Sequence, residues 1–127
     1  MPVHKFIVKH KNRNARTQPD SIYWTPKKVT HEPIRRNGGL RWEIFTQKEI
    51  TIKPKETTTL ILGLGIRMTK GVCLVSLRQE IKMRRLSLQD GTISEDVEDI
   101  IITIQNNSEV QVTIREGDSL CFIDYRL

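Results

Sequence analysis

The sequence predicts an all-β fold with at most one short helix. From Leu40 onward the chain divides into short runs rich in Val, Ile, Leu and Thr, and Gly, Asn or Ser separates one run from the next. Closely spaced runs of this composition are typical of a β-barrel or a β-sandwich. Prolines and glycines scattered between residues 11 and 41 exclude long helices from that stretch.

The expected elements follow one another along the chain. Residues 4–10 (HKFIVKH) predict a first strand, and residues 11–41 predict a loop-rich segment whose aromatic side chains at 22–24 cover the core. The next run, 41–54, alternates with a period of two and is interrupted by a turn near Thr46. Further strands are expected within 57–68, 71–77, 99–106, 109–117 and 119–127. Only 77–88 could hold a turn or two of helix.

The length of the chain bounds its organisation. With 127 residues and 14.8 kDa, it fits one domain over 1–127. No apolar run approaches the roughly 20 residues that cross a bilayer, and the first residues lack the apolar stretch of a secretory signal, so an intracellular protein without a membrane anchor is expected. Cys73 and Cys121 lie in apolar surroundings, which predicts buried thiols rather than a disulfide.

The positive charge is concentrated near the N-terminus. Of the net +6, residues 1–41 carry ten Lys or Arg against two acids, which makes 1–39 a basic, loop-rich segment. Such a segment either binds nucleic-acid phosphates or is a solvated arm. The candidate phosphate contacts are Lys5, Lys9, Lys11, Arg13, Arg16, Lys27, Lys28, Arg35 and Arg36.

Composition alone predicts neither a metal site nor a cofactor. The three histidines occur without Cys or carboxylate partners at ligand spacing, which argues against zinc. The Gly-Leu-Gly at 63–65 lies inside a strand-like run, where glycine usually marks a bulge or close packing. The acidic stretch 90–99 lacks the ligand spacing of a calcium loop and is expected to be a solvated turn.

Four segments, in order, resemble the motif series of the trimeric dUTP pyrophosphatases (dUTPases). Residues 40–71 resemble the opening AGYDL-type motif and the corner that follows, with Trp42-Glu43-Ile44 in place of Tyr-Asp-Leu. Residues 75–91 occupy the place of the phosphate-binding RSGLA motif, 91–108 look like GVIDxxYRGEIxVxxxN, and 114–123 look like GDRIAQL. The resemblance implies a dUTPase-like (β-clip) distorted barrel that assembles as a homotrimer.

The motif residues themselves depart from the family pattern. Ser94 stands where the family has the aspartate that activates water, and Val97 stands where it has the tyrosine that backs the deoxyribose. A serine hydroxyl is not a base at neutral pH. Arg78 is kept, but Gln79 replaces the phosphate-binding serine and Glu80 replaces the glycine. The sequence ends at Leu127, without the Gly-rich arm that closes over the nucleotide.

These departures predict a pseudoenzyme. The resemblance implies a viral protein that acts as a protein-interaction module, because catalytically dead relatives occur chiefly in viruses, such as the dUTPase-derived early-region proteins of adenoviruses. Host or viral proteins would then be the partners, in the host cytoplasm or nucleus.

Two alternatives remain open. One is a nucleic-acid-binding or virion structural protein that uses the basic segment. The other is a divergent nucleotide pyrophosphatase with Glu95 or Asp96 as base near Arg78 and with magnesium. The last residues also offer a candidate C-terminal partner motif, Tyr125 and Leu127, for capture by β-augmentation, unless the final strand ends flush with the fold.

Overall fold

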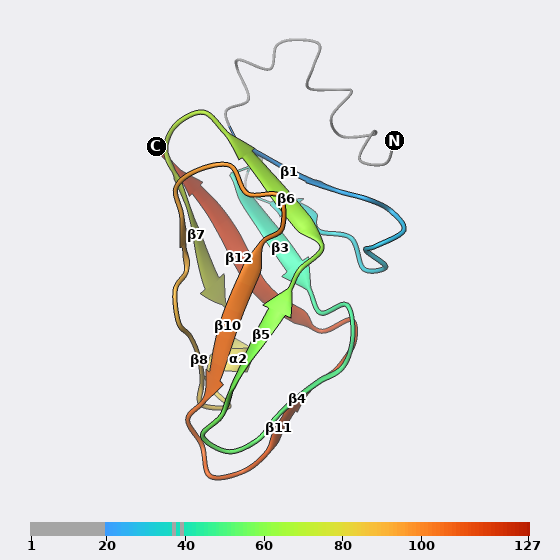
Figure 1. Ribbon diagram of the computed structural model, residues 1–127, viewed down its shortest axis with the longest axis vertical. Coiled ribbons are helices and arrows are strands. Elements are labelled where there is room, and N and C mark those ends of the chain that lie inside the picture. Colours follow the sequence, from blue (N-terminus) through green and yellow to red (C-terminus); the bar gives the residue numbers. More distant parts are fainter. Residues whose placement is uncertain (1–19, 37, 39) are drawn as a thin grey trace.

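The computed structural model describes residues 20–36, 38 and 40–127 (Figure 1). Strands dominate this part of the chain, and α2 (Gln79–Lys82) is its single helix, within the stretch where a short helix was expected. The all-β prediction is therefore confirmed. The expected strand at 4–10 lies outside the described residues.

The largest sheet has five strands in the order β2-β3-β12-β7-β9. These strands are β2 (Ile34–Arg36), β3 (Arg41–Phe45), β12 (Ser119–Arg126), β7 (Val72–Leu77) and β9 (Thr92–Ile93). The central strand, β12, pairs antiparallel with both β3 and β7. It therefore joins the first motif-like segment to the second.

Three smaller sheets complete the fold. One has the order β5-β10-β8, one pairs β11 with β4, and one pairs β1 with β6. Their bounds are β1 (Asp20–Trp24), β4 (Ile50–Ile52), β5 (Thr57–Ile61), β6 (Leu64–Met68), β8 (Leu86–Leu88), β10 (Ile101–Asn106) and β11 (Val112–Ile114). The sheets do not close into a continuous ring, so the barrel remains open between some of its strands.

One apolar core holds these sheets together. Alternation along strands such as β7 and β10 buries one face, and in β10 Ile102 and Ile104 are buried while Ile101 is exposed. Ile104, Ile114 and Ile123 are fully excluded from solvent. Burial of such side chains contributes roughly 25 cal/mol per Å² of apolar surface and is the main stabilising contribution.

The described part of the N-terminal segment contains two short strands that were not predicted, β1 and β2, which both lie within residues 1–39. Tyr23 and Trp24 belong to β1, which pairs with β6 and thereby satisfies its backbone donors and acceptors on one edge. Strands of three to five residues that lie close to prolines are too short to show a clear period in sequence.

Other local details also differ from the sequence prediction. The run 57–68 contains two strands, because Gly63 adopts a positive φ of 77° and ends the extended backbone of β5. Two further strands, β8 and β9, lie in stretches that were expected to be helix or loop. Cys73 and Cys121 are buried and are not joined in a disulfide, as expected. The described residues contain no helix long and apolar enough to cross a membrane.

Candidate functional site

A polar cavity of about 380 Å³ lies where β2, β3 and β12 meet the residue before α2. Its lining consists of Arg36, Arg41, Glu43, Arg78 and Phe122. Strand pairing brings them together, since Ile34 lies opposite Glu43 in the β2–β3 register and Glu43 lies opposite Phe122 in the β3–β12 register. Three arginines, one carboxylate and one aromatic ring therefore line the same cavity.

Glu43 is the centre of this cluster, and it is only 7% exposed. Arg36 donates from Nε and Nη2 to Glu43 Oε1, at 3.0 and 2.7 Å. Ser119 Oγ donates to Oε2 at 2.5 Å, and Arg78 Nη1 lies 3.5 Å from the same oxygen. The hydrogen bond from Ser119, with those of Arg36 and the charge of Arg78, lowers the pKa of Glu43 below its ordinary value despite burial. The carboxylate is thus ionised and fully engaged.

The remaining charges around the ring are also paired. Arg41 donates two hydrogen bonds to Asp124, from Nε to Oδ1 at 2.6 Å and from Nη2 to Oδ2 at 3.0 Å. The guanidinium carbons of Arg41 and Arg78 lie 4.3 and 5.0 Å from the Phe122 ring centroid, within cation–π range. Glu80 accepts from Arg78 Nη2 at 3.3 Å. Each guanidinium therefore has a carboxylate partner, and the cavity does not present unbalanced positive charge.

The other motif positions lie outside this cavity. Ser94, Gln79 and Val97 are absent from its lining. Gln79 and Ser94 are exposed, while Val97 forms an isolated antiparallel bridge with Ile66 and packs against the core. The structure thus brings Arg78 and Glu43 together in this cavity, and Ser94 and Val97 of the third motif-like segment do not line it.

Asp96 and Glu95, the alternative bases, have different environments. Asp96 Oδ1 accepts a hydrogen bond of 2.7 Å from the backbone amide of Met68, which ties the 94–99 loop to the end of β6. Glu95 is exposed on the same loop. The described residues hold no group of three His, Cys, Asp or Glu side chains arranged to bind a metal ion.

The basic candidates are dispersed. Arg36 is engaged by Glu43, and the Arg35 guanidinium lies 5.2 Å from the Trp42 ring centroid. Lys27 and Lys28 are exposed after β1. Lys5, Lys9, Lys11, Arg13 and Arg16 lie outside the described residues.

The C-terminal candidates lie at the end of β12. Tyr125 pairs with Cys73 of β7, its amide donates to Leu40 O at 2.9 Å, and its hydroxyl donates to Lys70 O at 3.0 Å. Leu127 follows the strand and is 82% exposed. Tyr125 is therefore part of the sheet in this structure.

Sequence reasoning did not single out Glu43, Arg41, Phe122 or Asp124 as members of one site. The sequence does hold a signal for Phe122, which aligns with the glutamine of GDRIAQL when residues 114–123 are aligned with that motif. It holds no signal for the ion pair between Arg36 and Glu43, because that pair depends on the register of β2 against β3.

Comparison with known proteins supports the fold. No protein family model matches the chain, and no curated protein matches its sequence. Solved structures do match. EIAV dUTPase superposes with a TM-score of 0.70 at 14% identity, over 84% of this chain and 86% of that one. A dUTPase variant of Staphylococcus bacteriophage 80alpha gives 0.73 at 14% identity, over 87% and 84%.

A third solved structure, a variant dUTPase of phage phi11 of S. aureus, gives a TM-score of 0.69 at 17% identity, over 84% of this chain and 89% of that one. The resemblance inferred from the order of the motifs is thus confirmed: this chain has a dUTPase-like fold. Identity this low shows the fold alone.

Proposed function

We propose that this chain is a non-enzymatic, dUTPase-like protein that acts as a protein-interaction module. The observation that carries the proposal is the pairing of Arg78 with Glu43. Arg78 occupies the second motif, where the resemblance implies a phosphate-binding arginine, and here it contacts two carboxylates and an aromatic ring.

Binding a triphosphate at this place would carry a large electrostatic cost. The incoming phosphates would have to draw Arg78 away from Glu43, whose buried carboxylate would lose part of its compensation, and they would approach Glu80 as well. Phe122 also replaces a hydrogen-bonding glutamine of the fourth motif with a ring that donates no N–H. The cavity therefore favours internal charge pairing over an anionic ligand.

The third motif supports the same proposal. The hydroxyl of Ser94 is not a base that could activate water. Val97 packs against the core and so is not available to contact a sugar. Asp96, the alternative base, already accepts a backbone hydrogen bond that shapes its loop. Among the described contacts, Glu95 accepts no such backbone hydrogen bond. Glu95 is therefore the better candidate for the catalytic base in the hydrolase alternative.

Partners, assembly and setting belong to the same proposal. The phage 80alpha dUTPases are described as controlling transfer of virulence genes by a proto-oncogenic G protein-like mechanism, which supports an interaction role for this chain by analogy of fold. We place this chain in a homotrimer inside a host cell, acting for a virus on host or viral proteins. Exposed apolar pairs such as Ile61 and Ile101, which are adjacent across β5 and β10, are suited to protein contact.

The test is dUTP turnover with magnesium at high protein concentration. We expect no pyrophosphate release above a buffer control. Turnover that disappears in Glu95→Gln or Asp96→Asn, while both variants keep the wild-type melting temperature, would overturn the proposal and establish the hydrolase alternative.

A further inference from the structure

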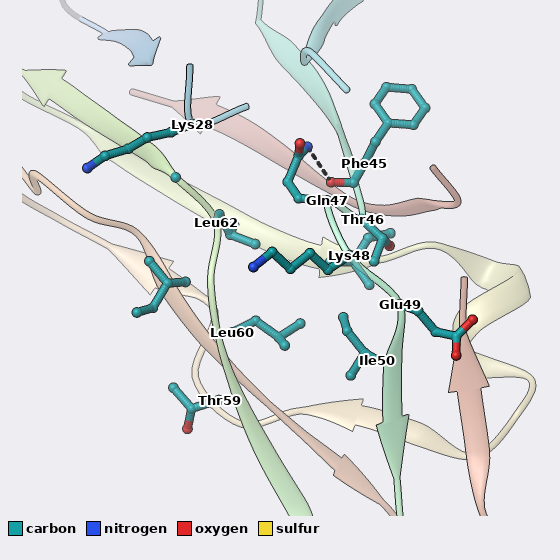
Figure 2. Close-up of a pocket in the computed structure, with 13 residues that line it drawn as sticks. Lys28, Phe45, Thr46, Gln47, Lys48, Glu49, Ile50, Thr59, Leu60 and Leu62 are labelled. Atoms are coloured by element: carbon teal, nitrogen blue, oxygen red, sulfur yellow. Dashed lines mark hydrogen bonds between the residues drawn. The ribbon is translucent and has the colours of Figure 1, made fainter. Parts of the chain in front are cut away.

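A second cavity, larger and more apolar, opens between β4 and β5 (Figure 2). Its volume is about 590 Å³, within the range of ligand-binding clefts. Leu60 from β5 and Ile50 from β4 point into the space between the two strands (Figure 2). Phe45, Leu62 and Leu120 also contribute to the lining, and we call this cavity the β4–β5 groove.

Both strands beside the β4–β5 groove keep an unpaired edge. In the described part of the chain β4 pairs only with β11, and β5 pairs only with β10. The β5 edge, Thr57–Ile61, has high β propensity and no charged residue. Natural sheets usually protect such edges with charge, proline or a covering segment. The sequence of β5 instead suits pairing with another extended strand.

The charge at the β4–β5 groove is positive. Lys28 and Lys48 line it, and within residues 20–36, 38 and 40–127 neither forms an ion pair with a carboxylate. Lys48 extends across the groove toward Leu62, whereas the Glu49 carboxylate points away on the other side of the chain (Figure 2). An occupant with carboxylates near its ends would complement these two ammonium groups.

We propose that the β4–β5 groove binds an extended, acidic segment of a partner protein, which adds as a strand to the free edge of β5. Apolar side chains at alternate positions would fill the groove, and flanking carboxylates would meet Lys28 and Lys48. The assignment rests on the interaction role proposed above and gives it a surface and a partner chemistry. The chain's own segment 4–10 is disfavoured as the occupant, because it carries Lys5 and Lys9.

The probes are two synthetic peptides with blocked ends and one pattern, Glu-Val-Thr-Val-Thr-Val-Glu and Lys-Val-Thr-Val-Thr-Val-Lys, each labelled with a fluorophore. Binding to the full chain is followed by fluorescence anisotropy at low and high salt. We expect saturable binding of the acidic peptide, roughly tenfold tighter than that of the basic peptide, because each rim ion pair contributes under about 1 kcal/mol.

Two variants separate the apolar and charged contributions. Leu60→Trp fills the groove and should abolish binding, whereas Lys28→Glu with Lys48→Glu should invert the preference toward the basic peptide. The matched control is Lys53→Glu with Lys82→Glu, which changes the net charge equally at exposed positions that do not line the groove. Peptide binding is compared only among variants whose melting temperature equals that of the wild-type protein.

The outcomes are distinct. No binding of the acidic peptide by a folded protein overturns the proposal, whether or not dUTP is hydrolysed. Equal loss of binding in the control pair would assign the effect to net charge and overturn it too. If Leu60→Trp instead lowers the oligomeric mass of the protein, a second copy occupies the groove and the partner assignment is wrong. Turnover of dUTP with intact peptide binding would leave the groove in place and remove only the non-enzymatic role.

Discussion

Glu43 and Arg78 form an ion pair, with Oε2 and Nη1 3.5 Å apart, between β3 and the residue that precedes α2. They belong to the first and second motif-like segments of the chain. Their pairing places an internal carboxylate beside the arginine that the dUTPase resemblance assigns to phosphate, and the proposal of a non-enzymatic role rests on this relationship.

The first prediction concerns the pH dependence of stability through Glu43. Its pKa is lowered in the folded state, first by the Ser119 hydrogen bond. The stabilisation by the carboxylate is therefore complete above the unfolded value, near 4.5, and is lost as the pH falls through the folded value. Glu43→Gln should cost about 2 kcal/mol at pH 7. It should also flatten the loss of stability below pH 4.5 in urea unfolding.

The matched control for that experiment is Glu95→Gln, because Glu95 is exposed. Its stability at pH 7 should lie within about 0.5 kcal/mol of wild type. If Glu43→Gln and wild type lose stability in parallel between pH 5 and 3, the ion pair contributes nothing in solution.

The second prediction concerns Asn106, which is fully buried at the end of β10. Its Nδ2 donates to Ile52 O at 2.9 Å and to Val110 O at 2.8 Å, while Oδ1 accepts from the Ser108 amide and hydroxyl. Asn106→Asp would place a carboxylate oxygen against two carbonyls at nearly unchanged volume. We expect a loss of about 3 kcal/mol in the free energy of unfolding.

Asn107 provides the comparison, because it is exposed and makes one side-chain bond, to Ser87 Oγ at 3.0 Å. Asn107→Asp should cost less than about 1 kcal/mol. Equal losses at the two positions would show that the buried network does not tie β4 to the 106–110 turn.

The third prediction concerns the C-terminal strand. The Tyr125 amide is hydrogen-bonded to Leu40 O, and the residue pairs with Cys73. We expect its amide hydrogen to exchange slowly, at a rate comparable with that of Ile123. Exchange at the rate of an unstructured peptide would mean that the tail is free, and it would favour the C-terminal partner motif formed by Tyr125 and Leu127.

The fourth prediction concerns thiol chemistry. Burial raises the pKa of Cys121 to about 12, and Cys73 is buried as well. Because the thiolate is the reactive form, neither thiol should react with a maleimide at pH 8 in the native protein, whereas both should react in denaturant. Rapid stoichiometric labelling of the native state would contradict the packing of β7 against β12.

The sequence predicts most strands of the C-terminal two thirds, because buried residues such as Ile102 and Ile104 alternate with less buried neighbours, but it misses β8 and β9. It predicts β1 and β2 poorly, since strands of three to five residues show no clear period. It could place Arg78 in a motif but could not show its partners. Those depend on the register that sets Glu43 opposite both Ile34 and Phe122.

The β4–β5 groove was not predictable for a related reason. A groove forms where pairing stops, and hydrophobic alternation in β4 and β5 does not reveal which edges remain free. The two lysines at its rim are unremarkable in sequence, where Lys28 reads as part of a basic segment.

The measurement that tests the central claim most directly is a calorimetric titration of the full chain with dUpNHpp and magnesium at low salt, with the oligomeric mass determined on the same sample. We predict no binding heat, because Arg78 remains paired with Glu43 and Glu80. Saturable binding at one nucleotide per chain would contradict the account. It would show that phosphate displaces the carboxylates of Glu43 and Glu80 from Arg78 and that the nucleotide site is intact.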